Sequence, residues 1–394
     1  MNECTKKFKI WAEIDLAALR HNFRLLQDTL QGRSPGCRII AVVKANAYGH
    51  GSDIVSAALA EEGCRDFAVS CLYEASLLKE SIPETADVLI LGYSLPEDAP
   101  QLTRLGIVQT VFSEEYAKAL SDRIAKSIRM GELPADTALR IHLKLDTGMN
   151  RLGFAADTPE ETAAAIRRVS ALPHLKTEGM FTHFACADTD AGDTGMTAVQ
   201  LARFEAVENA LRETGDCPPF LHCCNSAAAL TLPRAYKSAV RAGDILYGMS
   251  PFGRVLPDYR PVMTLRARIA HVHTLRAGDC VSYGAAFTAE KDMRIATVPL
   301  GYADGFLRHF GGASLRLSDG TDAPIVGRIC MDQCMIDVGD ADVHPGDPVT
   351  VFGGDDGSLL ESLAAVGVTI NYEITSILTP RVPRIPKECL TNTH

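Results

Sequence analysis

The sequence lacks the features that mark membrane-spanning, secreted and nucleic-acid-binding proteins. No apolar run approaches the ~20 residues that a membrane-spanning helix needs, and residues 1–10 are polar and lysine-rich, without the apolar stretch of a secretory signal. No basic run occurs, and the formal net charge of −10 disfavours nucleic acid and anionic membranes as partners. We therefore expect a cytoplasmic protein that binds neither nucleic acid nor a membrane.

Clustered cysteines are also missing. The twelve cysteines are spread over 394 residues and form no CxxC pair. This density is far below that of a disulfide scaffold. Neither Cys223-Cys224 nor the pair Cys330 and Cys334 lies beside a second pair at zinc-ligand spacing. We expect reduced, mostly buried thiols and no metal site.

What the chain does contain is enough sequence for about two domains. After residue 15, short β-rich runs alternate with helical patterns such as Ser52–Gly63, which has a serine N-cap and a closing glycine. Eight βα units before residue 249 fit a (β/α)8 barrel better than an open doubly wound sheet, although periodicity alone does not report closure. The expected strands are Ile39–Val43, Phe67–Ser70, Val88–Gly92, Val108–Phe112, Ala138–Leu145, Thr177–His183, Phe220–Cys224 and Ala239–Arg241.

After Gly248 the pattern changes to strand-like runs separated by Gly, Pro and Asp, which predicts a mainly-β domain. The early segment Phe8–Asp15 alternates like a strand and is expected to pair with that domain. We therefore expect an α/β protein, with a TIM-like barrel over residues 15–248 and a β-domain over residues 249–394 joined by an N-terminal strand within 1–14. The strand-like runs are Val262–His273, Asp279–Phe287, Arg294–Val298, Pro324–Val338 and Pro348–Phe352.

Chemistry in such a barrel collects at the carboxyl ends of the strands. Lys44 follows three apolar residues at the end of the first expected strand. Desolvation there would lower the pKa of its amine and suit it to Schiff-base chemistry. A lysine at a strand end is, however, more often a solvated or paired residue. Tyr48 follows near the next helix.

The fifth expected strand carries polar residues on its inward face. Alternation places His142, Lys144 and Asp146 on one side and the intervening apolar residues on the other. A buried lysine must be paired or neutralised. A purely structural ion pair between Lys144 and Asp146 is the simplest interpretation, and Arg151 follows in the next loop.

The last three strands end in further candidates. His183 ends the sixth strand, where a lone histidine is more often a satisfied core residue. Ser226 begins a helix after the seventh strand, and Gly243 follows the eighth. The loops after strands seven and eight frequently build a phosphate site in this fold. Together these positions predict a ligand that carries a phosphate.

The motifs that contain these residues resemble the bacterial alanine racemase family. AVVKANAYGHG looks like the family's signature around the lysine that binds pyridoxal 5′-phosphate (PLP). It is followed, in the family's order, by LKLDTGMNRLGF, THFACAD, HCCNSAAAL, VRAGDILYG, VSYGAAF, PLGYADGF, GRICMDQ and TPRVPR. The resemblance implies a homodimeric PLP enzyme that interconverts L-alanine and D-alanine and supplies D-alanine for peptidoglycan.

The resemblance also implies roles for single residues. Lys44 would bind PLP and act as the base for the D-enantiomer, with Tyr283 as the opposing base for the L-enantiomer. Arg241 would face the pyridine nitrogen, with His183 as its hydrogen-bond partner. An arginine has only donors, so it would disfavour a protonated pyridine and suppress transamination. The residues matching the rest of the cofactor site are Tyr48, Asn225, Ser226, Gly243, Asp244 and Ile245.

The remaining matches concern the substrate. Arg151 and Met331 would contact its carboxylate, Arg151 would also orient Tyr283, and Lys144 matches a lysine that is carbamylated in many members. A gate over the site would consist of Tyr302, Arg308 and Asp332. In family dimers, the residues that match Tyr283, Tyr302 and Met331 belong to the second subunit of each site.

Two departures from the family pattern stand out. Asn150 occupies a position where many members have glycine, which should alter only the loop. Pro380 replaces a tyrosine that helps to close the site in several members, so serine racemisation or a broad specificity is an alternative. A decarboxylase on the same barrel is disfavoured by VSYGAAF and MNRLGF. A non-catalytic PLP-binding protein would lack the β-domain, and an inactive barrel would leave the strand-end pattern unexplained.

Overall fold

The computed structural model describes residues 7–190 and 195–391. Its chain divides into two compact units. The barrel unit comprises Phe23–Ala45 and Ser52–Gly243, and the β-unit comprises Met1–Asn22, Asn46–Gly51 and Asp244–His394. Each unit is described by itself below.

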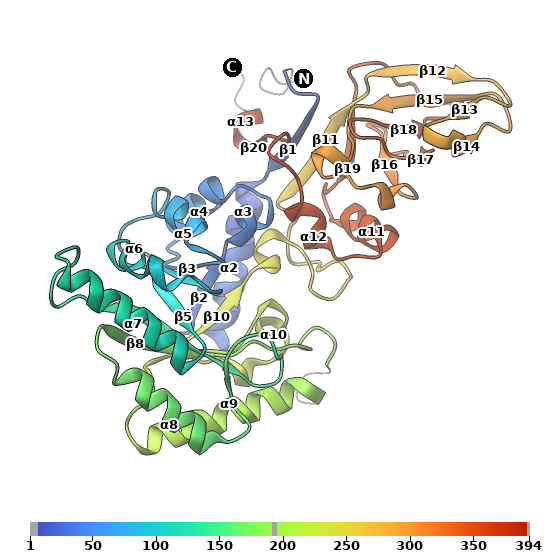
Figure 1. Ribbon diagram of the computed structural model, residues 1–394. Coiled ribbons are helices and arrows are strands. Elements are labelled where there is room, and N and C mark those ends of the chain that lie inside the picture. Colours follow the sequence, from blue (N-terminus) through green and yellow to red (C-terminus); the bar gives the residue numbers. More distant parts are fainter. Residues whose placement is uncertain (1–6, 191–194, 392–394) are drawn as a thin grey trace. The chain divides into compact units, whose positions relative to one another are not determined.

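The barrel unit is built on eight parallel strands of the described chain, as the sequence predicts (Figure 1). The two end strands, β9 and β10, are joined by hydrogen bonds from Ser238 N to Leu221 O (2.8 Å) and from Arg241 N to Cys224 O (3.0 Å). These bonds close the sheet into a barrel. In spatial order the strands are β10 (Ala239–Ala242), β2 (Arg38–Val42), β3 (Asp66–Val69), β4 (Asp87–Ile90), β5 (Val108–Val111), β6 (Leu139–Asp146), β8 (Leu175–Phe181) and β9 (Phe220–His222).

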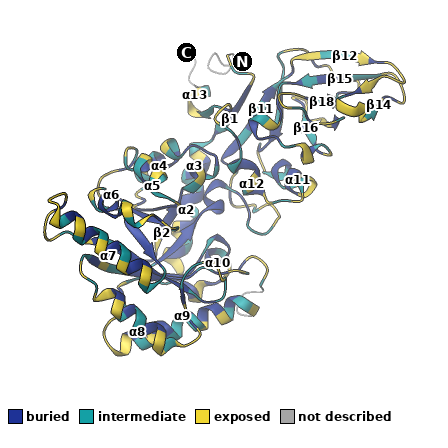
Figure 2. Cartoon of the chain, viewed as in Figure 1, coloured by how far each residue is buried: buried dark blue, intermediate teal, exposed yellow. Residues whose placement is uncertain are grey.

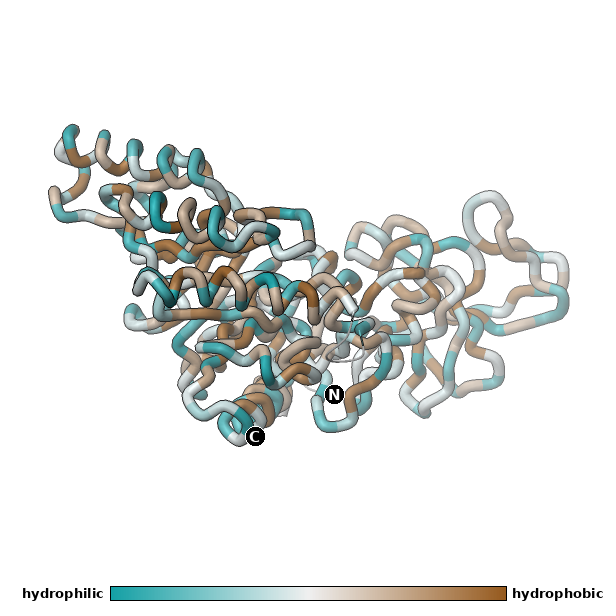
Figure 3. Tube along the Cα trace, turned by 90° about the horizontal axis from the view of Figure 1, so that it is seen from below, coloured by the Kyte–Doolittle hydropathy of each residue, from teal (hydrophilic) through white to brown (hydrophobic). Residues whose placement is uncertain are grey.

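The helices around the barrel bury one face and expose the other (Figure 2). In α7 (Glu114–Arg129), Ser113 caps the first turn by accepting from Tyr116 N, and Leu120 and Ile124 are buried. Hydrophobic and hydrophilic residues alternate along such helices (Figure 3), as expected for a helix packed on a sheet. The other helices of the predicted barrel domain are α2 (Leu16–Arg33), α4 (Ser52–Glu61), α5 (Leu72–Lys79), α6 (Ala99–Arg104), α8 (Pro159–Ser170), α9 (Gly195–Glu213) and α10 (Ser226–Thr231).

The β-unit is dominated by one mixed sheet. Strand β1 pairs antiparallel with β11, with Ile14 opposite Met263, so the predicted pairing of the N-terminal strand with the β-domain is confirmed. Helices α11 (Ser358–Gly367), α12 (Asn371–Ser376) and α13 (Glu388–Thr391) follow. In sheet order the strands are β12 (His271–Leu275), β15 (Met293–Val298), β18 (Cys334–Asp337), β17 (Asp322–Val326), β16 (Ser314–Arg316), β19 (Pro348–Phe352), β11 (Met263–Arg268), β1 (Ile10–Ile14) and β20 (Arg384–Pro386).

Three expected strands of the β-domain are wrong as continuous elements. Val262–His273 is divided into β11 and β12, and Pro324–Val338 into β17 and β18. Asp279–Phe287 is interrupted between β13 (Cys280–Val281) and β14 (Phe287–Thr288) by the turn η4 (Tyr283–Ala285). The positive φ angles of Ser282 (70°), Gly284 (71°) and Ala285 (46°) are incompatible with an extended strand there.

All eleven cysteines in the described part of the chain are free thiols. Five of them are buried, whereas Cys280 and Cys389 are exposed, so the expectation of mostly buried thiols is too strong. No helix among the described residues is long and apolar enough to cross a membrane. Within the same residues, no group of three or more His, Cys, Asp and Glu side chains could hold a metal ion.

The loop after β6 depends on a glycine. Gly153 has φ of +139°, and a Cβ there would lie 2.3 Å from Asp146 N and 2.6 Å from Leu145 C. The absence of a side chain therefore lets the loop fold back on β6, where β7 (Phe154–Ala155) pairs with it.

We predict that Gly153→Ala destabilises the barrel by about 2–6 kcal/mol, because strain in a glycine-only conformation and overpacking each cost about 1–3 kcal/mol. Gly131→Ala is the matched control, since Gly131 has φ of +74° and a Cβ there would meet nothing within 4 Å. It should lose only about 1–2 kcal/mol. Urea unfolding of both variants measures the difference, and equal losses would contradict the steric argument.

Candidate active site

Lys44 lies two residues after the end of β2 and begins a strained turn. It opens α3 (Lys44–Tyr48), in which Ala45, Asn46, Ala47 and Tyr48 have φ of 51°, 55°, 53° and 53°. Four consecutive non-glycine residues are therefore left-handed, which costs about 1–2 kcal/mol per residue. Backbone strain of this size persists only where the surroundings enforce it, and it clusters at functional sites.

Glu74 holds the first part of this turn. One carboxylate oxygen accepts from Ala45 N (2.7 Å) and the other from Ser70 N (2.8 Å). Further along, His50 Nδ1 donates to Ala47 O (3.1 Å) and Tyr48 O (3.0 Å). Burial lowers the pKa of His50 to about 4, so the ring is neutral and acts as a fixed donor. These contacts over-determine the backbone just after Lys44.

Lys144 does not pair with Asp146, which corrects the expectation of an ion pair. Its Nζ donates to Leu145 O (2.9 Å) and Leu152 O (3.2 Å). Asp146 instead accepts from Gly148 N (2.9 Å) and Asn150 N (3.0 Å), which closes the loop that leads to Arg151. The carboxylate is thus used by the turn.

Burial lowers the pKa of Lys144 to about 8, with further lowering from Arg241 and Arg151. The amine is therefore neutral above about pH 8. Asn150 has φ of 56°, a conformation that asparagine adopts more readily than most residues. Its departure from the family's glycine is accordingly accommodated by the loop.

Arg241 on β10 is 2% exposed and has only neutral acceptors. One terminal nitrogen donates to His222 Nδ1 (2.7 Å) and His222 O (2.9 Å). The other donates to Thr182 O (2.7 Å) and Cys223 O (2.8 Å) and lies 3.3 Å from His183 Nδ1. Among the described residues, no group accepts from its Nε–H. Burial lowers the pKa of Arg241 to about 10, so the guanidinium stays charged at neutral pH.

The carboxyl end of the barrel is strongly cationic. The pKa of His183 is held well below its usual value, first by burial and then by Arg241, Arg151, Lys144 and Lys44. These four cations come from β10, the loop after β6, β6 itself and the start of α3, just after β2. All four lower the pKa of one ring, so the potential around His183 is positive and favours an anionic ligand.

The loops after β9 and β10 meet at Ser226. Asn225 caps α10 by accepting from Ala228 N (3.0 Å). Ser226 follows it, and its Oγ accepts from Gly243 N (3.0 Å). Asp244 and Ile245 come next in the chain, at the start of η3 (Asp244–Tyr247). The Ser226 hydroxyl therefore lies where these two loops meet, at the place where the sequence predicts a phosphate.

The other expected site residues belong to the β-unit. Tyr283, Met331 and Asp332 line one hollow of about 500 Å³. Tyr283 is 73% and Met331 53% exposed, and the two lie side by side in this hollow. Asp332 accepts from Arg381 (2.7 Å). Tyr48, whose ring centroid lies 5.2 Å from that of Tyr247, and the exposed residues Tyr302 and Arg308 also belong to this unit.

Sequence reasoning missed Glu74, His142 and His222. His222 opens the HCCNS motif and is the nearest side-chain partner of Arg241, a role that the resemblance gave to His183. The position of His222 on an inward strand face is the sequence feature that could have identified it as a site residue. Glu74 lies in a helix with no motif around it, and nothing in the sequence marks its contact with Ala45 N.

The fold and these side chains define a barrel enzyme that places a strand-end lysine beside cationic groups suited to an anionic ligand. The chain matches the family "Alanine racemase, N-terminal domain" over residues 14–251 and "Alanine racemase, C-terminal domain" over residues 262–386. The alanine racemase of Desulfovibrio desulfuricans is 41% identical over 379 residues, covering 95% of this chain and 97% of the relative.

Solved structures agree with this match. The alanine racemase of Clostridium difficile has a TM-score of 0.85 and 35% identity, covering 95% of each chain. The alanine racemase of Bacillus anthracis with bound L-Ala-P has a TM-score of 0.84 and 32% identity, covering 95% of this chain and 94% of that one. The chain belongs to the alanine racemase family, which confirms the resemblance seen in its motifs.

We predict that Lys144 carries a carbamate. Only a neutral amine attacks CO₂: Nζ forms the new C–N bond, one proton leaves, and the product is an anion. That anion would form charge-assisted contacts with the neighbouring arginines in place of repulsion. Because the pKa of Lys144 is lowered to about 8, the carbamate should increase as the pH rises towards 8.

Carbon-13 NMR of the protein in labelled bicarbonate measures this modification. A carbamate signal should be present in the unchanged protein and missing in Lys144→Gln, with Lys176→Gln as a control at an exposed lysine. A spectrum without any signal that depends on Lys144 would show that its two carbonyl contacts alone hold the amine.

Proposed function

We propose that this protein is a PLP-dependent racemase that interconverts L-alanine and D-alanine with two bases, Lys44 and Tyr283. Family membership over nearly the whole chain supports the reaction. The observation that carries the proposal is the buried cation Arg241. Its terminal nitrogens have four acceptors within 2.9 Å, whereas its Nε–H has none among the described residues. That N–H suits a ring nitrogen without a proton.

The residues of the barrel unit fit PLP. Lys44 offers an amine, Ser226 offers a hydroxyl that accepts from Gly243 N and can donate its own proton, and Arg241 offers Nε–H. We infer that Tyr48, Asn225, Asp244 and Ile245 complete the phosphate site. When bound, PLP supplies an electron sink that makes the α-proton of an amino acid acidic.

The chain's own residues then determine the stereochemistry. Lys44 removes or returns the α-proton at Nζ on one face, and Tyr283 does the same at Oη on the opposite face. Arg241 disfavours a proton on the pyridine nitrogen, because a cation with no lone pair cannot accept a hydrogen bond from it. With PLP bound, this effect of Arg241 would weaken the electron sink and so limit loss of the amino group. Arg151 and Met331 bind the substrate carboxylate.

We infer that the working enzyme is a homodimer. Tyr283 and Met331 are largely exposed in a single chain, although both have large apolar surfaces. Groups of this kind commonly mark a surface that another molecule covers. We propose that they complete the site of a second copy, together with Tyr302, and that Tyr302, Arg308 and Asp332 form its gate.

We assign residues 15–248 to the PLP-binding domain and residues 249–394, with the strand within 1–14, to the β-domain. The proposed role is the supply of D-alanine for peptidoglycan in the cytoplasm. A related second function is serine racemisation, favoured by Pro380. This residue is exposed and has no polar side chain, so it cannot make the contact of the tyrosine found in several family members.

Racemisation assays with L-alanine and L-serine test the function and its alternative together. We expect fast racemisation of alanine and slower but measurable racemisation of serine. Lys44→Ala should lose both activities and the visible absorption band of lysine-bound PLP. Retention of a borohydride-reducible PLP adduct in Lys44→Ala would refute the assignment of Lys44, and undetectable serine turnover would show that Pro380 is neutral.

The two bases predict an asymmetric effect of Tyr283→Phe, which keeps the ring and removes the oxygen. In D₂O the variant should still exchange the α-proton of D-alanine through Lys44, with return to the same face. Exchange of L-alanine should be very slow, and racemisation in both directions should fall by roughly 10²–10⁴-fold, the usual effect of a positioned base. NMR with a chiral derivative measures deuterium in each enantiomer. Near-normal racemisation would remove Tyr283 from the mechanism.

A further inference from the structure

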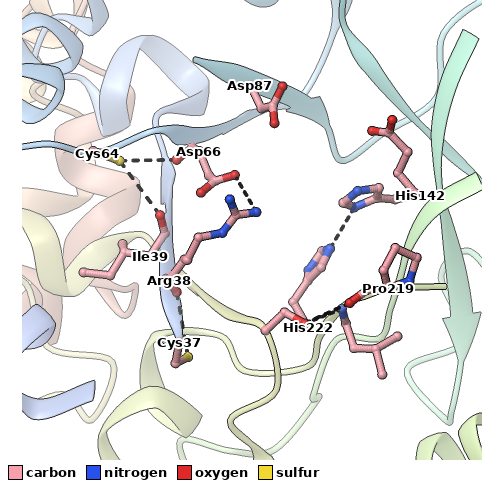
Figure 4. Close-up of polar contacts among 12 residues, drawn as sticks. Cys37, Arg38, Ile39, Cys64, Asp66, Asp87, His142, Pro219 and His222 are labelled. Carbon is pink, nitrogen blue, oxygen red and sulfur yellow. Dashed lines mark hydrogen bonds and ion pairs between the residues drawn. The ribbon is translucent and has the colours of Figure 1, made fainter. Parts of the chain in front are cut away.

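A chain of hydrogen bonds continues from Arg241 towards the opposite, amino-terminal end of the barrel. His222 Nδ1 lies 2.7 Å from the Arg241 guanidinium. On its other side, His222 Nε2 lies 3.0 Å from His142 Nδ1, and Figure 4 shows this bond. The ring of His222 also stacks on Phe181, with centroids 4.7 Å apart and an interplanar angle of 9°. The three linked residues come from the barrel strands β10, β9 and β6.

The chemistry of the donors fixes every proton in this chain. Arg241 can only donate, so His222 Nδ1 must accept and its proton must be on Nε2. That N–H donates to His142 Nδ1, which must also carry no proton. Each ring is therefore a neutral Nε2–H tautomer, and protonation of either ring would break one of the two hydrogen bonds.

The barrel backbone makes room for His142 at this place. The pairing of β6 with β8 shifts register between Ile141 and His142, so that Ile141 lies opposite Thr177 and His142 opposite Gly179. A Cβ on Gly179 would lie 2.6 Å from His142 Nε2 and 2.7 Å from two ring carbons. The imidazole therefore lies directly over a glycine, and any other residue would displace it.

The surroundings of His142 keep it uncharged. It is 6% exposed and lines a cavity of about 400 Å³. The charged groups of that cavity include two sets of ion pairs: Arg38 with Asp66 (3.2 Å), and Arg140 with Asp87 (2.6 Å) and Glu178 (2.7 Å). Burial lowers the pKa of His142 to about 4.

We propose that His142 is a positioning residue for the racemisation, acting through His222 to hold Arg241. By accepting from His222 Nε2–H, it locks the tautomer that presents a lone pair to Arg241. This fixes the guanidinium with its Nε–H towards the cofactor site. The inference rests on the proposed function, because Arg241 matters to the reaction only if PLP is bound there.

Two substitutions separate this role from packing. In His142→Asn, the side-chain oxygen occupies nearly the place of Nδ1 and can still accept from His222. His142→Leu has a similar size and cannot accept. Gly179→Ala leaves every hydrogen-bonding group unchanged and displaces the ring of His142, so it should have the same effect as His142→Leu. It therefore tests the proposal independently if the leucine variant does not fold.

The first readout is the tautomer of His222 in the full-length holoenzyme, measured by NMR of ¹⁵N-histidine-labelled protein. The unchanged protein should show His222 with a proton on Nε2 alone. His142→Asn should keep that pattern. In His142→Leu and Gly179→Ala, the two ring-nitrogen shifts of His222 should move towards each other as other protonation states become populated.

The second readout is the amount of pyruvate formed per racemisation. In this side reaction PLP and alanine become pyridoxamine phosphate and pyruvate, without an external oxidant. Looser positioning of Arg241 should raise the ratio roughly two- to tenfold in His142→Leu and Gly179→Ala, the factor that one hydrogen bond typically carries. His142→Asn should remain within about twofold of the unchanged protein.

The proposal is overturned if either readout stays unchanged in folded His142→Leu and Gly179→Ala. It is also overturned if His142→Asn and His142→Leu have equal effects, because His142 would then contribute packing alone. The tautomer is measured without any assay of turnover. If the proposed function is wrong, the protein without substitutions will not racemise alanine, whatever the tautomer of His222.

Discussion

The buried guanidinium of Arg241 is the interaction on which the rest of the site depends. A cation that is 2% exposed would normally be paired with a carboxylate. Here its acceptors are the carbonyl oxygens of Thr182, His222 and Cys223 and the rings of His222 and His183. The charge is solvated by dipoles without being neutralised. It therefore keeps its full electrostatic effect on whatever accepts from Nε–H.

The barrel supplies these acceptors because its strands converge at one end. β10 contributes Arg241, its neighbour β2 is followed two residues later by Lys44, and β8 and β9 bring the carbonyl groups. The left-handed turn after Lys44 adds a strained segment that Glu74 fastens at Ala45 N. Strain and unneutralised charge are both costly, and both lie where the proposed chemistry takes place. Closure of the sheet supplies the contacts that offset them.

The sequence predicted the barrel well, because each strand and helix has its own local pattern of apolar residues. It predicted continuous strands in the β-domain less well, since the interruption at Ser282 requires a positive φ that no local pattern announces. Asp146 was assigned to the wrong partner because two loop amides compete for its carboxylate. Glu74 and His142 were missed because their partners are 29 and 80 residues away. Contacts of this kind depend on tertiary packing, which a single sequence does not reveal.

The central claim is that Arg241 holds the cofactor's ring nitrogen free of a proton. The most direct measurement is the ¹⁵N NMR shift of the pyridine nitrogen in protein loaded with ¹⁵N-labelled PLP. We predict an unprotonated nitrogen at neutral pH, with a shift towards the protonated value in Arg241→Glu, whose carboxylate can accept a hydrogen bond. A protonated nitrogen in the unchanged protein would contradict this account of the site.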